Sequence, residues 1–191
     1  MDNQRILAWM NCYGAWAPEL RSSVETKGYS EYLDGVIKYI LPIKNQIRAF
    51  YISGGMIDQE GRTECQTVKP ELGKRFAAND IDIKINADEE SVTSSSIMKT
   101  FLLTWMDEYP KCKPLIFVDQ VRFHTNSYAF EYYCQKFGIR DLKANEVIIP
   151  IDRSDTHPHS TIEYQNKKLE TMKQVGVEEV ERREIESRKN N

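Results

Sequence analysis

The sequence has few of the residues that metal and redox sites need. Its 191 residues include three histidines and four cysteines, and Cys12, Cys65, Cys112 and Cys134 form no C-x-x-C pair. Zinc ribbons and thioredoxin-type sites depend on that spacing, so the sequence argues against both. A chain of this length buries enough surface to fold without disulfides, so we expect reduced thiols.

A basic excess and long apolar runs are also lacking. Lysine and arginine total 26 against 29 aspartates and glutamates, so nucleic acid is not the expected partner. No window approaches the apolar length of a membrane span. The segment from Met1 to Arg5 leads into a short apolar stretch interrupted by Asn11, unlike a signal peptide. We therefore expect a cytoplasmic protein with no membrane partner.

What is present is an ordinary globular balance, with 40% apolar and 29% charged residues, and five short apolar runs. The runs are rich in the residues typical of strands, and they are Ile6–Met10, Ala49–Ile52, Ile81–Ile85, Leu115–Val118 and Val147–Ile151. Ala49–Ile52 and Leu115–Val118 are almost continuously apolar, which indicates strands covered on both faces. Ile81–Ile85 alternates with charged residues, which favours an edge strand or one with a wet face.

Segments with helical spacing separate these runs. Three with a clear apolar face are Tyr32–Ile40, Ile97–Trp105 and Tyr128–Phe137. In a fourth, Thr63–Phe76, we expect Pro70 to break or kink the helix. The alternation of strands and helices predicts an α/β protein: a Rossmann-like three-layer α/β/α sandwich with a mostly parallel five-stranded sheet.

The end of the chain differs from the rest. We expect one domain over residues 1–175 and a charged C-terminal helix or tail over residues 176–191. Beyond Gly176 only Val180 and Ile185 are apolar anchors among many charges. Such a pattern is typical of a solvated, fraying helix, and the alternative is an oligomer contact that would make the protein a homo-oligomer.

The loop after the second strand is the most informative stretch. In sheets of this kind ligands bind at the carboxyl ends of the strands. Here Ser53 is followed by Gly54 and Gly55, whose N–H groups are suited to an anion-binding nest. Glu64 lies in the first turn of the next helix, as a dipole partner, a capping residue or a functional carboxylate. Neither a Walker loop nor a G-x-G-x-x-G pattern is present.

Polar residues follow the other strands too. The further candidates for ligand binding are Asn11, Gly14, Asp88, Ser91, Ser94, Asp119 and Arg122, with His124 as a candidate acid or base. Arg122 and His124 are suited to gripping an anion, and the serines to donating hydrogen bonds to a phosphate or sugar. Plain turns, helix caps and a surface arginine are the ordinary alternatives.

Two histidines close to aspartates, His157 and His159, suggest a metal site after the fifth strand. No third ligand has a persuasive spacing, so we expect no metal and leave the cofactor unknown.

These motifs together resemble those of the YdcF/SanA/ElyC-like family. Ile52-Ser53-Gly54-Gly55, followed by Thr63-Glu64-Cys65, is similar to its "SGG…SEA" signature. Asp88 with Ser91 and Ser94 resembles "D-x-S-x-x-T", and Val118 through His124 resembles "V-T-S-x-x-H". The resemblance spans roughly Ile6 to Pro150. It implies a Rossmann-like fold, a polar pocket at the strand ends, nucleotide-like ligands and an acidic residue at Glu64.

Three functions fit these observations. The first is a small-molecule-binding protein or enzyme for a nucleotide-like or phosphorylated ligand, with Glu64 or His124 as acid or base, and a hydrolase or transferase rather than an oxidoreductase. The second is a nucleoside-deoxyribosyltransferase-like enzyme, suggested by Tyr51–Met56. The third is a non-enzymatic module that assembles through its C-terminal helix.

Overall fold

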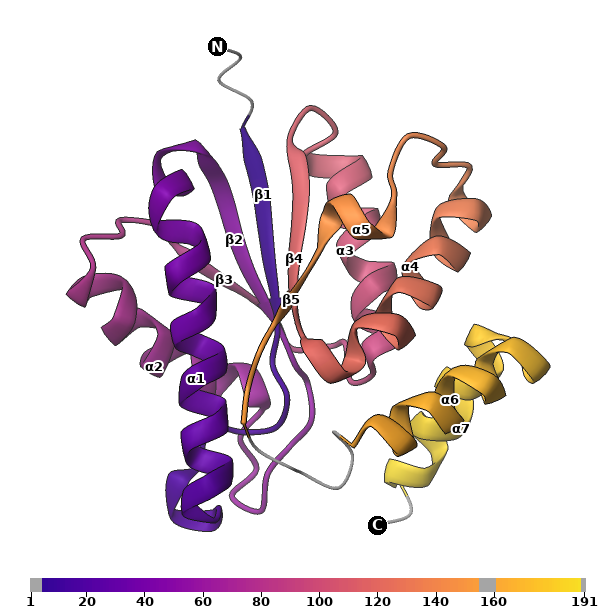
Figure 1. Ribbon diagram of the computed structural model, residues 1–191, viewed down its shortest axis with the longest axis horizontal. Coiled ribbons are helices and arrows are strands. Elements are labelled where there is room, and N and C mark those ends of the chain that lie inside the picture. The colour runs from indigo at the N-terminus through magenta and orange to yellow at the C-terminus, as the bar shows by residue number, and fades with distance from the viewer. Residues whose placement is uncertain (1–4, 155–160, 190–191) are drawn as a thin grey trace.

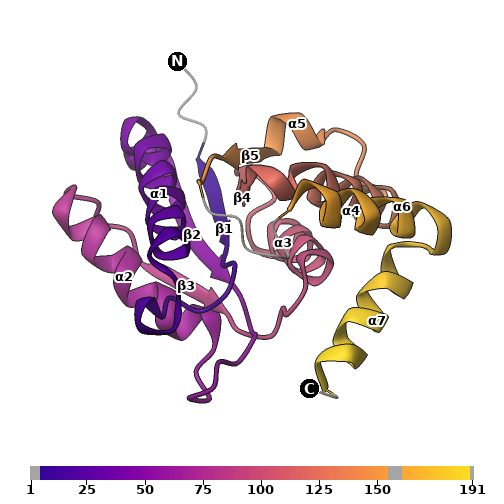
Figure 2. The same cartoon turned by 60° about the horizontal axis from the view of Figure 1, so that its bottom comes forward.

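A computed structural model describes residues 5–154 and 161–189. Its five strands form one all-parallel sheet in the order β3-β2-β1-β4-β5. The strands are β1 (Ile6–Asn11), β2 (Ile47–Ser53), β3 (Ile85–Asp88), β4 (Lys113–Asp119) and β5 (Ile148–Ile151). Helices cover both faces of the sheet (Figures 1 and 2), which confirms the predicted Rossmann-like three-layer fold.

The helices divide between the two faces. They are α1 (Ser23–Ile40), α2 (Glu64–Ala78), α3 (Ser94–Glu108), α4 (Phe123–Phe137), α5 (Ala144–Val147), α6 (Ile162–Val175) and α7 (Val177–Lys189), with 3₁₀ turns η1 (Pro18–Leu20), η2 (Leu41–Gln46) and η3 (Gln120–Arg122). Helices α1 and α2 pack on one face, and α3 and α4 on the other. Helices α6 and α7 lie on the α3–α4 side, against α4 and α3 (Figure 1).

Side-chain caps begin most of the longer helices. Ser22, Thr63, Thr93 and Thr161 each accept a hydrogen bond from a backbone N–H of the first turn. Such caps satisfy donors that have no partner inside the helix. Helix α4 ends at Gly138, whose φ of 73° is the left-handed conformation that glycine adopts without strain.

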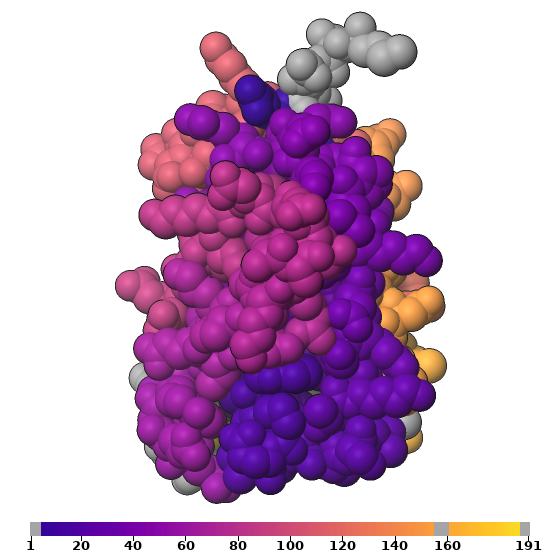
Figure 3. Space-filling view, turned by 90° about the vertical axis from the view of Figure 1, so that its left-hand side faces the viewer, coloured from indigo at the N-terminus to yellow at the C-terminus, as the bar shows by residue number. Residues whose placement is uncertain are grey.

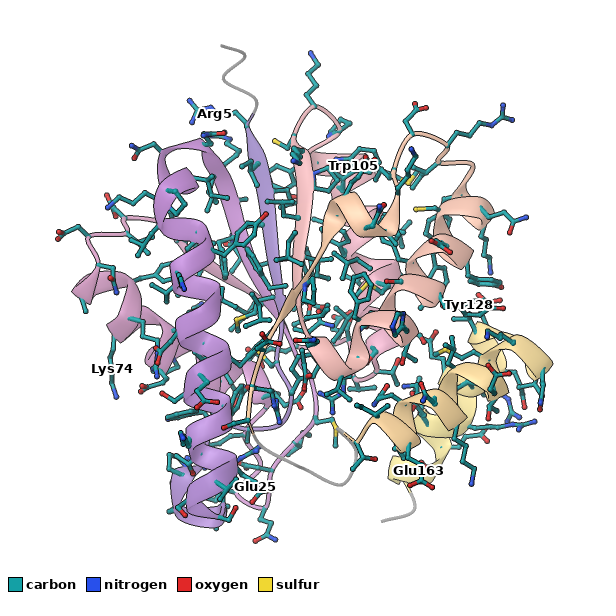
Figure 4. The ribbon with its side chains drawn as sticks, viewed as in Figure 1. Arg5, Glu25, Lys74, Trp105, Tyr128 and Glu163 are labelled. Atoms are coloured by element: carbon teal, nitrogen blue, oxygen red, sulfur yellow. The ribbon has the colours of Figure 1, made fainter. Side chains whose placement is uncertain are left out.

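Alternation along β1 divides the core into two layers. Ile6, Ala8 and Met10 pack toward α1 and α2, whereas Leu7 and Trp9 pack toward α3 and α4. Every residue of β1 is buried, as expected of the central strand in a sheet covered on both faces. The strands run from Arg5 at the amino end toward the edge where Glu25 and Glu163 lie (Figure 4), so the loops that follow the strands gather at that edge.

Two local predictions were wrong, and a third, that Pro70 breaks or kinks its helix, was wrong about the break. The third strand was predicted to begin at Ile81, but its pairing with β2 begins only at Ile85. The Ile81 N–H instead donates to the Phe76 carbonyl at the end of α2. Val147 ends α5 and does not open β5. Pro70 lies inside α2 without ending it, because the Thr63 cap and the buried side chains of that helix hold it on both sides of the proline.

The C-terminal helix is packed more closely than a solvated, fraying helix would be. Val177 and Val180 of α7 are buried against the α3–α4 side of the core, while Ile185 is only half-buried. Tyr133 donates a 2.8 Å hydrogen bond to Glu181, which fixes α7 to α4. The apolar anchors of α7 are therefore used inside the chain. Within residues 5–154 and 161–189, no helix has the length and hydropathy of a membrane span.

Candidate functional site

The strand order reverses between β1 and β4, so ligands are expected near the ends of these two strands. Asn11 ends β1 and Asp119 ends β4, and both side chains are buried. The Tyr32 hydroxyl lies 3.0 Å from the Asn11 carbonyl oxygen and 3.1 Å from that of Phe117. One side chain of α1 thus ties the two strands together directly behind the switch point.

The glycine pair after β2 does not form the predicted anion nest. The Gly54 N–H donates to the Asp88 carbonyl at 3.1 Å, and the Gly55 N–H donates to the Ser91 carbonyl at 3.0 Å. Both donors are therefore occupied by the neighbouring β3–α3 loop, and the nest interpretation is wrong. Neither glycine has a positive φ, so unusual backbone angles do not explain the pair.

Close packing explains these glycines instead. A Cβ on Gly55 would lie 2.1 Å from the Glu89 carbonyl oxygen, and a Cβ on Gly54 would lie 2.5 Å from Glu64 Oε2 and 2.8 Å from Cys12 Cβ. Real Cβ atoms essentially never come within 3.0 Å of another heavy atom. The loops after β1, β2 and β3 meet at this point, and only glycine leaves room for them.

A buried hydrogen-bond chain joins the next group of predicted residues. Trp9 Nε1 donates to Ser53 Oγ, and Ser53 Oγ donates to Asp88 Oδ2, both at 2.7 Å. Asp88 Oδ1 accepts the Ser91 N–H at 3.2 Å and so shapes the β3–α3 loop. Ser94 is the first residue of α3 and follows the capping threonine. The structure therefore brings Ser53, Asp88 and Ser91 together as a network that organises the loops.

Glu64 lies where expected, in the first turn of α2 beside Gly54, and is 6% exposed. Its Oε1 accepts the Gly14 N–H at 2.5 Å, and the Tyr29 hydroxyl donates to the Gly14 carbonyl at 3.0 Å. These two bonds hold the β1–α1 loop, in which Gly14 has a φ of 91°. The geometry makes Glu64 an anchor for that loop, and a role in handling a ligand stays a prediction.

Two buried thiols stand next to this carboxylate. Burial raises the pKa of Cys12 well above its ordinary value, and a hydrogen bond with Cys65 and the nearby charge of Glu64 raise it further. Cys65 in turn contacts the carbonyl oxygens of Ile52 and Asp88. A thiol with a raised pKa carries little thiolate at neutral pH, so Cys12 is not arranged as a nucleophile.

Asp119 is the centre of a second cluster. Its Oδ2 lies 3.4 Å from Arg153 Nε and 3.7 Å from Arg122 Nη1, and its Oδ1 accepts the Val121 N–H at 2.8 Å. The Arg122 guanidinium also lies over the Tyr13 ring, 4.1 Å from its centroid. The Asp119 N–H donates to the Tyr13 hydroxyl at 2.9 Å, and burial raises the pKa of that phenol. Loops from three strands thus converge on one carboxylate.

A cleft of about 400 Å³ opens beside this cluster, at the carboxyl ends of β4 and β5. Its lining residues are Asp119, Gln120, Val121, Phe123, His124, Pro150, Asp152, Arg153, Ile162 and Asn166. The Arg153 side chain is 2% exposed, whereas His124, in the first turn of α4, is exposed. A buried hydrogen bond of 2.8 Å from Thr125 to Gln165 fixes α6 as one wall of the cleft.

The sequence analysis missed Tyr13, Arg153, Ile162 and Asn166 as residues of this region. An arginine in the loop that follows the fifth strand was a signal for Arg153, because such loops form the sheet's binding edge. The convergence of Arg153 with Asp119 depends on the pairing of β4 with β5. Larger cavities lie elsewhere, including one of about 610 Å³ at the amino ends of β1 and β4.

Asn11 is the least satisfied of the predicted residues. It is fully buried, and neither its Nδ2 nor its Oδ1 has a hydrogen-bond partner in the described parts of the chain. Its position after Trp9 places the side chain on the α3–α4 face of the sheet. Buried amides without partners are uncommon in folded proteins.

Residues 5–154 and 161–189 contain no group of three or more side chains arranged to hold a metal ion. The histidine pair His157 and His159 lies outside the described residues, so its role stays a prediction. Comparisons with protein-family models, with curated proteins and with solved structures find no match. The resemblance to the YdcF/SanA/ElyC-like family therefore also stays a prediction.

Proposed function

We propose that this protein binds a nucleotide-like or phosphorylated small molecule in the cleft at the carboxyl ends of β4 and β5. The observation that carries the proposal is the placement of the Arg153 guanidinium and the His124 imidazole on one cleft of about 400 Å³. Guanidinium groups bind phosphate oxygens through two parallel hydrogen bonds, and a histidine adds a further donor.

The apolar part of the cleft supports a ligand that also carries a ring. Phe123 and Ile162 line it together with the polar groups, and Ile162 is 69% exposed. Ligand sites typically combine apolar walls with a few polar groups that fix orientation. A nucleoside monophosphate matches this division, with its base against Phe123 and its phosphate at Arg153.

The test is a melting-temperature screen with inorganic phosphate, nucleoside monophosphates and sugar phosphates. A ligand at one hundred times its dissociation constant is expected to add about 2.7 kcal/mol of stability. Arg153→Lys keeps the charge but loses the planar fork, so we expect at least tenfold weaker binding, about 1.4 kcal/mol. Arg48→Lys, at an exposed position at the opposite end of the sheet, is the matched control. Equal binding by Arg153→Lys, or no shift with any phosphate compound, would contradict the proposal.

Two further variants distinguish binding from catalysis. His124 is exposed at the rim and is the side chain best placed to exchange a proton with a bound ligand. If the protein is an enzyme, His124→Gln should keep binding and lose turnover. Glu64→Gln should bind the ligand like the parent, because the Glu64 carboxylate holds the Gly14 N–H. The predicted cytoplasmic location and the absence of a metal stay predictions.

A further inference from the structure

The β3 edge of the sheet is open. Strand β3 pairs with β2 alone and lies at the end of the sheet (Figures 1 and 2). Ahead of it, Asp82, Ile83 and Lys84 lead into β3 and lie outside the paired strand. Unpaired backbone groups at a sheet edge are a template for another strand.

The opposite edge is closed to such pairing. Strand β5 has four residues and contains Pro150, which has no backbone N–H to donate. Proline at an edge is a common way in which proteins prevent edge-to-edge association. The two edges of this sheet therefore differ, because β5 contains a proline and β3 (Ile85–Asp88) contains none.

The side chains along the open edge are complementary to themselves. Ile81, Ile83 and Ile85 face the α2 side of the sheet, where Ile81 and Ile85 are buried. Asp82 and Lys84 are exposed, and neither takes part in an ion pair with the described residues. When two such segments run antiparallel about an axis through Ile83, each Asp82 faces the Lys84 of the second copy. Each Ile81 then faces an Ile85.

The geometry points to a two-fold dimer in which two copies of this chain pair their β3 edges antiparallel, centred on Ile83. Isologous contacts of this kind are the commonest basis of homodimers. An edge kept free of partners usually carries like charges or inward lysines, which repel a second copy. Here the two charges that flank the centre have opposite signs, so self-pairing makes two attractive contacts.

A groove beside helix α2 can accommodate part of the second copy. A groove of about 770 Å³ runs beside the edge, lined by α2 and by residues 80–85. Figure 3 looks onto this side, where α2 and the segment leading into β3 (purple to magenta) lie on the surface. A Cβ on Gly73 would meet nothing within 4 Å, so this part of α2 admits a close neighbour. In the proposed dimer the second α2 lies on the same face of the joined sheet and covers the groove.

Charge-reversal variants test the dimer, with the dimer dissociation constant measured by sedimentation equilibrium. The control is a double variant in which the two charges are exchanged. Lys84→Asp gives each edge two acidic side chains, and Asp82→Lys gives each edge two basic ones. We expect either variant alone to raise the dimer dissociation constant at least tenfold, because two attractive pairs become repulsive. Mixing the two variants restores attraction and should give a heterodimer. The double variant D82K/K84D should dimerise like the parent, and Lys111→Asp, on an exposed turn, should change nothing.

Other outcomes would overturn the proposal. A parent chain that stays monomeric at all concentrations would refute it directly. A dimer that both single reversals leave intact would place the interface elsewhere, with the exposed face of α7 the next surface to test. Failure of the mixed variants to associate would show that the two charges do not face each other. Circular dichroism of each variant confirms that it is folded before it is scored.

Discussion

Gly55 gives the sharpest test of how the loops at the binding edge are held. A Cβ at this position would lie 2.1 Å from the Glu89 carbonyl oxygen, whereas ordinary contact begins at 3.4 Å. Gly55→Ala must therefore move the two loops apart by roughly 1.3 Å, the difference between those distances. Overpacking of this kind costs about 1–3 kcal/mol. Straining the Gly55 N–H bond to the Ser91 carbonyl adds about 0.5–1.5 kcal/mol, so we expect a loss of about 2–4 kcal/mol.

Urea unfolding followed by circular dichroism measures this loss of unfolding free energy, and thermal unfolding gives the melting temperature. For a chain of this size the expected fall in melting temperature is roughly 5–15 °C. Gly73→Ala is the matched control, because its Cβ meets no atom within 4 Å and it lies inside α2. There alanine should stabilise the protein by about 0.5–1 kcal/mol. A Gly55→Ala protein as stable as the parent would refute the packing explanation and reopen a ligand-related role for this glycine.

Three further changes test the packing of other elements. Ser53→Ala leaves the buried Trp9 indole and the half-buried Asp88 carboxylate without their hydrogen bonds, so unfolding in urea should require about 1–3 kcal/mol less free energy. Val180→Ala should cost about 2 kcal/mol because this side chain of α7 is buried, whereas the exposed Val175→Ala should cost little by the same measurement. A hydrogen bond from Lys136 lowers the pKa of Glu178 in the folded protein. The pair should therefore stabilise α7 fully at pH values above the unfolded pKa of about 4.3. This stabilisation should be lost as the pH falls through the lower folded pKa. Stability measured from pH 7 down to pH 2 should show this loss in the parent and a shallower one in Glu178→Gln.

The sheet was predictable because its central strands are continuous apolar runs. Leu115–Val118 is fully buried, and in Ala49–Ile52 only Tyr51 is half-buried, as expected of strands covered on both faces. The third strand was misplaced because the alternating pattern of Ile81–Ile85 fits a strand whether or not it is paired. Pairing depends on where β2 lies beside it, which is a property of the tertiary structure and not of the local pattern.

The candidate site was predictable in place but not in detail. The sequence singled out Gly54 and Gly55 at the end of the second strand, but it predicted an anion nest there and not close packing. It could not show that the crowding atom belongs to Glu89 and not to a ligand, because that contact joins loops distant in the chain. Arg153 was missed for the same reason, since its approach to Asp119 exists only once β4 and β5 are paired.

The position of β1 has a consequence for synthesis of the protein. This strand is made before the other four strands of the sheet, yet it lies at the centre, between β2 and β4. Its pairing with β2 needs the chain only as far as Ser53, whereas its pairing with β4 needs the chain through Phe117. During translation the second side of β1 therefore stays without a partner while α2, β3 and α3 emerge. An apolar strand with a bare edge is prone to aggregate, so nascent chains that stop short of β4 should be the form that requires chaperones.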